Sequence, residues 1–339
     1  MFSMSKRDPH PSAQTKLFAA HHQEGKGRSA SGPEWADMLR RALLQPMQHA
    51  CSGRIWVAHI DHRGQGECAF CTLRAERSGP APSAYPSEVL VARLRRDLRR
   101  FTSHKGWVWF SPWADPFVPA ARDLAAPALR AAEELLRSGL DLTLNTRGGL
   151  RDASALVTLA RRYPGRLRVN IEFFAKDAAL VAEWERGVAS VSERLALAEA
   201  LKQAGAEVVA TIGPLIPMVN DSAQALSSLG RELRQAGLLE WHLRWIRYAS
   251  GLVAQVRREV SRSRARMLEG WFHMGRGAGG SLPEIPERVR RTIIARVHEV
   301  ADKQGAQLLV CRCASSVGRG KCVHGPEVHL VKEQLDLFA

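Results

Sequence analysis

The sequence predicts an α/β protein built as a partial TIM-like (β/α)6 barrel with extensions at both ends. Three observations lead to this fold class. Apolar segments of strand length alternate with helical segments of about ten to fifteen residues between residues 106 and 245. Hydrophobic residues make up 45% and charged residues 24% of the 339 residues, which is enough apolar material for a full core. Five or six such units in succession favour a barrel over a two-layer α+β fold, because parallel strands need both faces covered.

Glycine, proline and capping residues set the expected boundaries of these elements. The expected strands span residues 55–60, 107–110, 140–145, 167–174, 207–212, 240–245 and 307–310. The expected helices span residues 33–45, 124–138, 152–162, 192–204, 222–235, 252–271 and 287–304. Gly139, Gly205 and Gly237 follow the ends of helices, and Ser192 is a cap-like residue at a helix start. In such a barrel, functional residues are expected just after the carboxyl ends of the strands.

Composition divides the chain into four expected regions. Residues 1–33 are rich in polar residues without an apolar period and are expected to form a mobile tail. Residues 34–250 form the barrel, residues 251–330 a basic helical region with a group of cysteines, and residues 331–339 a C-terminal tail. There is no apolar run of about 18 residues and no signal-peptide stretch, so we expect a cytoplasmic protein with no membrane partner.

The positive charge of the chain suggests a polyanionic partner. Lys and Arg number 49 against 34 Asp and Glu, a net charge of +15. Five arginines gather in the expected helix 252–271, namely Arg257, Arg258, Arg262, Arg264 and Arg266. They would either neutralise the phosphates of a nucleic acid or form an ordinary solvated helix face. The aromatic residues Trp241, Trp245, Tyr248 and Trp271 would either stack on bases or pack in the core.

The six cysteines form two groups of three, which suggests metal binding. Disulfides are rare in reducing compartments, so Cys51, Cys68 and Cys71 are candidate ligands. The pair Cys68-x-x-Cys71 follows the first barrel strand and favours an iron–sulfur cluster over structural zinc. A thioredoxin-like redox role is less favoured, because no helix clearly starts at Cys71.

The second group would make a complete site by itself. Cys311, Cys313 and Cys322 with His324 supply three thiolates and one imidazole, a ligand set for zinc or a second iron–sulfur cluster. Alternatively, one of these cysteines donates a hydrogen atom or binds the first cluster.

Five segments carry a family resemblance, in the same order along the chain. They are Cys68-Ala-Phe-Cys71, Ser111-Pro-Trp-Ala-Asp115-Pro-Phe117, Leu144-Asn-Thr-Arg-Gly148 with Arg151-Asp152, Trp184-Glu185 through Arg194, and Ile212-Gly-Pro-Leu-Ile-Pro217 through Asp221. Together they cover roughly residues 50–245. This series resembles the spore photoproduct lyase-like proteins of the radical S-adenosylmethionine (SAM) superfamily.

The resemblance implies a fold, cofactors and a reaction class. It implies a radical SAM type of barrel that holds a [4Fe–4S] cluster and SAM, with a reductant such as flavodoxin or ferredoxin. Cleavage of SAM would give a 5′-deoxyadenosyl radical that abstracts hydrogen from a substrate, with DNA repair or modification as the nearest analogy. By motif or strand-end position, Asp115, Thr146, Asn170 and Arg194 are the expected SAM contacts.

The sequence departs from this family at the first cysteine. The position four residues before Cys68 is Gly64, so Cys51 is the expected third ligand, with His62 or a C-terminal cysteine as alternatives. The third alternative is that the cluster has been lost, which would leave a binding scaffold. Two other functions stay open: a clamp-associated nucleic-acid-binding protein with structural metal sites, and a radical SAM enzyme for RNA, peptide or small-molecule chemistry.

The C-terminal peptide suggests a protein partner. Gln334, Leu335, Leu337 and Phe338 resemble the short peptide with which bacterial replication and repair proteins bind the sliding clamp. A free tail with two apolar anchors can bind a preformed groove at modest entropic cost. The alternative is a tail that packs on its own domain.

Overall fold

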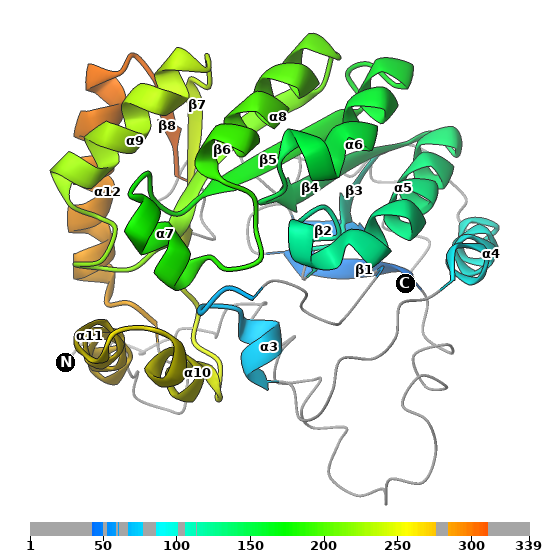
Figure 1. The fold of residues 1–339 in the computed structure, drawn as a ribbon. Helices are drawn as coiled ribbons and strands as arrows, with labels where there is room; N and C mark the ends of the chain where they lie inside the picture. Colours follow the sequence, from blue (N-terminus) through cyan, green and yellow to red (C-terminus); the bar gives the residue numbers. More distant parts are fainter. Residues whose placement is uncertain are drawn as a thin grey trace, which may run out of the picture.

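A computed structural model gives the fold, and it describes residues 43–49, 53–58, 60, 67–76, 86–100, 106–112, 114–275 and 284–310. These residues form an eight-stranded sheet in the order β1 to β8 (Figure 1). The strands are β1 Leu44–His49, β2 Gly53–Ala58, β3 Gly106–Phe110, β4 Leu140–Thr146, β5 Leu167–Phe173, β6 Glu207–Leu215, β7 Glu240–Trp245 and β8 Gln307–Leu309. Strand β1 is antiparallel to β2, and β2 to β8 are parallel.

Helices follow most of the parallel strands. They are α3 Thr72–Glu76, α4 Ser87–Leu98, α5 Arg122–Arg137, α6 Leu150–Arg162, α7 Ala178–Trp184, α8 Val191–Gln203, α9 Ala223–Gln235, α10 Leu252–Glu259, α11 Arg262–Met274 and α12 Glu287–Lys303, with a 3-10 turn at Pro119–Ala121. Helices α5, α6, α8, α9 and α12 cover one face of the sheet, and α3, α10 and α11 lie together below it in Figure 1.

The two faces of the sheet differ in polarity. Side chains alternate between the faces of a strand, so Leu142 and Leu144 face one side while Thr143 and Asn145 face the other. The apolar set packs against the helices in the main core. The polar set continues across the sheet through the buried residues Asn170, Thr211 and His242. Asn170 is paired with Asn145 of β4, and Thr211 is paired with His242 of β7. The inner face of the open barrel is therefore polar, and its carboxyl edge is where a ligand site is expected.

Most of the expected elements are present, and three differences have physical causes. The expected helix 33–45 is a strand at its last two residues, because β1 begins at Leu44 and contains Pro46, which cannot donate in a helix; residues 33–42 lie outside the described part. The expected helix 252–271 is two helices, since Val260 is extended (φ −122°, ψ 169°). A helix, α3, does begin directly after Cys71, contrary to expectation.

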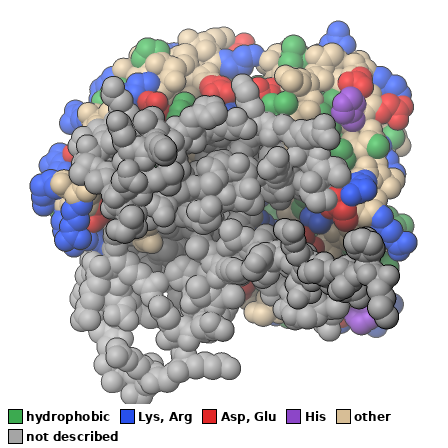
Figure 2. Space-filling model, turned by 180° about the vertical axis from the view of Figure 1, so that it is seen from behind, with side chains coloured by type: hydrophobic (Ala, Val, Ile, Leu, Met, Phe, Trp, Pro, Cys, Tyr) green, Lys and Arg blue, Asp and Glu red, His purple; other side chains and the backbone are tan. Residues whose placement is uncertain are grey.

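The surface and the helices bear on the partners expected from the sequence. No helix among the described residues is long and apolar enough to cross a membrane. Figure 2 shows the molecule from behind, where lysine and arginine side chains lie along both margins and are interspersed with acidic ones. On the visible part of this face, the positive charge is therefore spread out and does not form one patch.

Candidate active site

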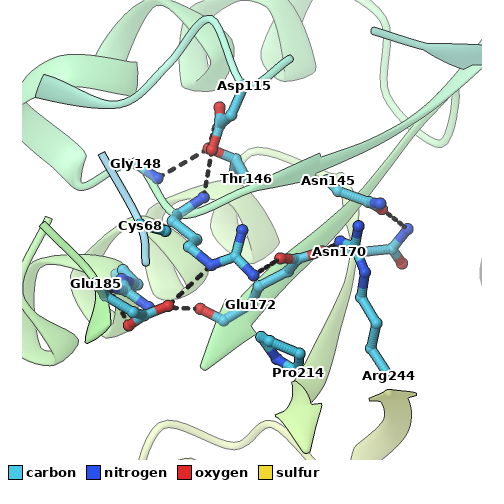
Figure 3. Close-up of polar contacts among 12 residues, drawn as sticks. Cys68, Asp115, Asn145, Thr146, Gly148, Asn170, Glu172, Glu185, Pro214 and Arg244 are labelled. Carbon is cyan, nitrogen blue, oxygen red and sulfur yellow. Dashed lines mark hydrogen bonds and ion pairs between the residues drawn. The ribbon is translucent and has the colours of Figure 1, made fainter. Parts of the chain in front are cut away.

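A cavity lies at the carboxyl edge of the sheet, where the expected functional residues meet. Its walls come from the cysteine turn, from the loop after β3, and from the ends of β4 to β7. The lining side chains used below are those of Cys68, Phe70, Cys71, Thr72, Asp115, Asn145, Thr146, Arg147, Glu172, Arg244 and Arg247. Figure 3 shows how several of them converge from neighbouring strands.

The two described cysteines form one wall of the cavity. Cys68 is buried and Cys71 is half-buried, and the backbone N–H of Cys71 donates to the carbonyl of Cys68 at 3.0 Å. Burial raises the pKa of the Cys68 thiol to about 12, although the positive charge of Arg147 opposes the rise. The thiol of Cys68 donates weakly to the carbonyl of Arg186 at 4.0 Å. Ionisation of Cys68 therefore needs a strong positive partner, such as a metal centre.

Asp115 lies across the cavity and binds the end of β4. Its carboxylate accepts from the N–H of Arg147 at 2.6 Å, the N–H of Phe117 at 3.0 Å and the hydroxyl of Thr146 at 3.0 Å. Burial nevertheless raises the pKa of Asp115 to about 6. Gly148 allows the backbone after β4 to approach Phe117 closely. A Cβ at this position would lie 2.1 Å from the carbonyl oxygen of Phe117.

A chain of buried ion pairs forms the floor of the cavity. The guanidinium of Arg147 pairs with Glu172 and, at 2.8 Å, with Glu185, and it lies 5.0 Å from the ring centroid of Phe70. Glu172 also pairs with Arg244. Burial disfavours the charge on Glu172, but Arg147 and Arg244 hold its pKa below the usual value. Glu172 stays ionised at neutral pH because cations flank it.

Arg194 supports this floor from behind. Its side chain is fully buried and donates to the carboxylate of Glu185 at 2.8 Å and to the carbonyls of Glu172 and Ala189. It does not line the cavity. Asn170 likewise lies one layer below, where its amide donates to Asn145 at 2.8 Å. Of the four expected SAM contacts, Asp115 and Thr146 line the cavity, while Asn170 and Arg194 do not line it and contact residues that do.

Four lining residues with ionisable side chains, Arg147, Glu172, Arg244 and Arg247, were not singled out from the sequence. Arg147 lies inside the motif Leu144–Gly148, and Glu172 interrupts an otherwise apolar strand. An ionisable residue in a buried strand was the available signal for Glu172. Arg244 had no local signal, since its partner Glu172 is 72 residues away.

The arginines expected to bind nucleic acid lie on α10 and α11, below the sheet in Figure 1. Arg257 pairs with Glu269 at 2.5 Å, and Arg264 pairs with Glu183. Arg258, Arg262 and Arg266 are exposed. The five arginines are therefore not equivalent as candidate phosphate ligands.

The four aromatic residues expected either to stack on bases or to pack in the core also differ in their surroundings. Trp241 is fully buried and its indole N–H donates to the carbonyl of Leu238, so it belongs to the core. Trp245 lines the cavity. The indole N–H of Trp271 donates to the carbonyl of Pro217 at 3.2 Å, and Tyr248 packs edge-on against Phe272.

Several expected site residues lie outside the described part of the chain. They are Cys51, Cys311, Cys313, Cys322 and His324, and the clamp-like residues Gln334, Leu335, Leu337 and Phe338. Within the described ranges, no group of three or more His, Cys, Asp or Glu residues is close enough to hold a metal ion. Among the described residues, Cys68 and Cys71 are the two thiols that line this cavity.

Comparisons with known proteins agree on the fold. No protein-family model matches the chain. Uncharacterized proteins of Mycobacterium bovis and Mycobacterium tuberculosis are 29% identical over 208 residues, and the match spans 58% of this chain and 58% of each relative.

Solved structures of spore photoproduct lyase cover more of the chain. A complex with dinucleoside spore photoproduct aligns with a TM-score of 0.57 and 14% identity, over 88% of this chain and 94% of that one. A double mutant with bound AdoMet and dinucleoside spore photoproduct aligns with the same coverage, a TM-score of 0.57 and 15% identity. The partial-barrel fold expected from the sequence is thereby confirmed: this chain has the fold of spore photoproduct lyase.

Proposed function

We propose that the protein is a radical SAM enzyme that acts on a nucleic acid, with DNA repair or modification as the reaction class. One observation carries this proposal: the Cys68–Cys71 turn shares a cavity with Asp115, Arg147 and Arg244 at the carboxyl edge of the sheet. Similarity to a lyase solved with AdoMet and a dinucleoside lesion supports both the cofactor and the substrate class.

The residues present fit a [4Fe–4S] cluster in two of its three thiolate positions. Cys68 and Cys71 come from one tight turn, and soft sulfur ligands favour iron–sulfur clusters. Burial keeps the Cys68 thiol protonated in the absence of a cation, and the nearby Arg147 lowers the cost of ionising it. A cluster would supply the positive charge that the thiolates need.

The direction of the strands bears on the source of the third thiolate. His49 and Gly53 pair at the start of β2, on the edge opposite the cavity, and Cys51 falls between these two residues in the sequence. Strand β2 itself spans about 17 Å. Strand β8 runs parallel to β7, and its last residue pairs with His242, two residues before Arg244. Cys311 follows only two residues later, so the strand directions favour the C-terminal group over Cys51.

The remaining lining residues suit the polar groups of SAM. When bound, the cluster and SAM supply the electron transfer and the hydrogen-abstracting radical. Asp115 accepts three hydrogen bonds and keeps acceptor capacity for an amino group. The side chain of Arg244 is 41% exposed and retains N–H groups for a carboxylate.

Anaerobic reconstitution with iron and sulfide tests this proposal. We expect a visible iron–sulfur absorbance, and SAM cleavage when dithionite replaces a flavodoxin or ferredoxin. A protein that assembles no cluster and cleaves no SAM would refute the enzyme hypothesis.

Single cysteine variants then identify the third ligand. We expect Cys51→Ala to keep the SAM-responsive signal in electron paramagnetic resonance, and one of Cys311→Ala, Cys313→Ala or Cys322→Ala to lose it. Loss with Cys51→Ala alone would restore Cys51 as the ligand. If all three C-terminal variants keep that signal but lose bound metal, the C-terminal group with His324 forms its own zinc or iron–sulfur site.

We further propose that the C-terminal peptide docks on a bacterial sliding clamp. Its support is the sequence resemblance alone. Deletion of residues 334–339 should weaken clamp binding in a pull-down with purified clamp while leaving SAM cleavage intact. Equal clamp binding by the deletion variant would contradict this part of the proposal.

A further inference from the structure

Helix α10 contacts the backbone of the cysteine turn directly. The side chain of Gln255 is buried, and its Nε2 donates to the carbonyl of Ala69 at 2.9 Å and to that of Cys71 at 3.1 Å. One amide group therefore uses both of its N–H bonds on the turn. The contact joins residues 184 and 186 positions apart, so it is specific to the folded structure.

A second residue of α10 reaches the same turn through an arginine. The guanidinium of Arg74 donates to the carbonyl of Cys68 at 2.9 Å and pairs with Glu259 at 2.5 Å. Glu259 also pairs at 2.5 Å with Arg186, whose own carbonyl accepts from the Cys68 thiol. Glu259 thus pairs with both arginines that contact Cys68, namely Arg74 at its carbonyl and Arg186 at its thiol.

The backbone permits this close approach. Gly251, directly before α10, lies against α3: a Cβ there would meet the carbonyl oxygen of Ala75 at 1.9 Å. Leu252 and Val256 of α10 are buried in the same core cluster as Cys68. Helix α10 therefore packs directly against the cysteine turn and α3.

These contacts set the direction of the peptide groups in the turn. The carbonyls of Cys68, Ala69 and Cys71 all accept from side chains held by α10, and those of Cys68 and Cys71 also accept from the backbone N–H groups of Cys71 and Ala75. In a planar trans peptide the N–H points opposite to the C=O, so the N–H groups of Phe70 and Thr72 point away from α10. Phe70 and Thr72 both line the cavity. Amide N–H groups on that side stabilise negative charge on sulfur, whereas carbonyls there would oppose it.

We propose that Gln255 and Glu259 are positioning residues for the Cys68–Cys71 pair, which turn the carbonyls of the cysteine turn away from the cavity and its N–H groups toward the sulfur ligands. The nature of the ligand rests on the proposed function, but the contact itself does not. Gln255 acts on two carbonyls directly, and Glu259 acts on one through Arg74.

The experiment compares Gln255→Met with two matched controls in the full-length protein. Gln235→Met makes the same substitution at an exposed position of α9, and Val256→Ala removes apolar packing of α10 in the core cluster of Cys68 while leaving the hydrogen bonds to the turn in place. The first measurement is the iodoacetamide labelling rate at Cys68 without iron, followed by mass spectrometry of the tryptic peptide 64–74. That peptide contains Cys68 and Cys71, which fragmentation distinguishes.

We expect Gln255→Met to label Cys68 about tenfold faster, because two buried hydrogen bonds no longer oppose local opening of the turn. Both controls should stay within about twofold of the unmodified chain. Wild-type labelling by Gln255→Met would overturn the proposal, and so would equal acceleration by Val256→Ala. Should Gln255→Met fail to fold, Glu259→Gln is the second variant. It should label faster than both controls, and a wild-type rate would overturn the proposal.

The second measurement is the reduction potential of the reconstituted cluster. We expect a more negative potential in Gln255→Met and an unchanged one in both controls, since N–H groups near sulfur favour the reduced state. An unchanged potential in Gln255→Met would overturn the orienting role. A wild-type protein that assembles no cluster would refute the proposed function, while the labelling rates would still decide whether α10 holds the turn.

Discussion

The two ends of the polar inner face carry the same kinds of residue in different surroundings. At the carboxyl edge, Arg147, Glu172 and Arg244 pair beside a cavity that also holds Cys68. At the amino edge, Arg168 pairs with Glu240 at 3.0 Å and with Glu207 at 3.4 Å. None of these three amino-edge residues lines that cavity.

Exposure of the acids separates the two ends. The side chains of Glu207 and Glu240 are 49% and 35% exposed, whereas those of Glu172 and Glu185 are 1% and 0% exposed. Water therefore solvates the acids at the amino edge, and protein charges alone compensate those at the carboxyl edge. Ion pairs as such do not mark a site in this molecule. What distinguishes the carboxyl edge is a fully buried acid, Glu172, that lines a cavity together with thiols.

The largest expected effect is the loss of the proposed cluster from the carboxyl edge. Cys68→Ala should reduce the SAM-responsive electron paramagnetic resonance signal to below about a tenth of the wild-type signal, because two thiolates do not hold a cluster. His242→Gln, which alters the amino edge, should retain the signal. Equal loss in both variants would mean that the two ends are not functionally distinct.

The free energy of unfolding should fall more on removing an acid at the carboxyl edge than on removing one at the amino edge. Glu172→Gln leaves Arg147 and Arg244 without their shared buried partner, so we expect a loss of about 3 kcal/mol in the free energy of unfolding. Glu240→Gln removes a partly exposed partner and should cost about 1 kcal/mol or less. Urea titration at pH 7 measures both values. Similar losses in the two variants would contradict the difference drawn from burial.

Local patterns in the sequence predicted much of the fold and part of the site. The strand expected at residues 240–245 matches β7, and that expected at 140–145 lacks only Thr146, because glycine turns delimit them. Asp115 and Thr146 were identified because each lies in a motif next to a strand end. Contacts between distant segments were not predictable in this way.

The contacts of α10 could not be predicted from the sequence. Gln255 carries no motif, and its partners lie more than 180 residues earlier. The arginines around it indicated a nucleic-acid surface, while its contact with the cysteine turn depends on the close approach at Gly251. Charge is visible in a sequence, but the side of a helix that meets another segment is set by the tertiary fold.

The pH dependence of stability should have opposite signs at the two edges. Asp115 has a folded pKa of about 6 against 3.8 for the free group, so the folded state binds more protons between these values. Its contribution to stability is present below pH 4 and falls by about 2 kcal/mol as the pH rises to 6. Burial lowers the pKa of His242, so its contribution is lost as the pH falls below the ordinary value of 6.5.

Variants isolate these two contributions. In urea titrations from pH 4 to 8, Asp115→Asn should gain stability relative to the wild type as the pH rises, and His242→Gln should gain as the pH falls. For each variant, the free energy of unfolding of the variant is subtracted from that of the wild type and plotted against pH. If both plots had slopes of the same sign, the pKa shift assigned to Asp115 or to His242 would be wrong.

The smallest expected effect concerns the arginines below the carboxyl edge, and it depends on the proposed nucleic-acid substrate. Arg258 is exposed, whereas Arg257 pairs with Glu269. Arg258→Gln should lower the slope of log affinity against log salt for a single-stranded oligonucleotide by about 0.7, the value of one phosphate contact. Arg257→Gln should change it less, because its ion pair must break first. Equal slopes for Arg258→Gln and the wild type would show that Arg258 makes no phosphate contact.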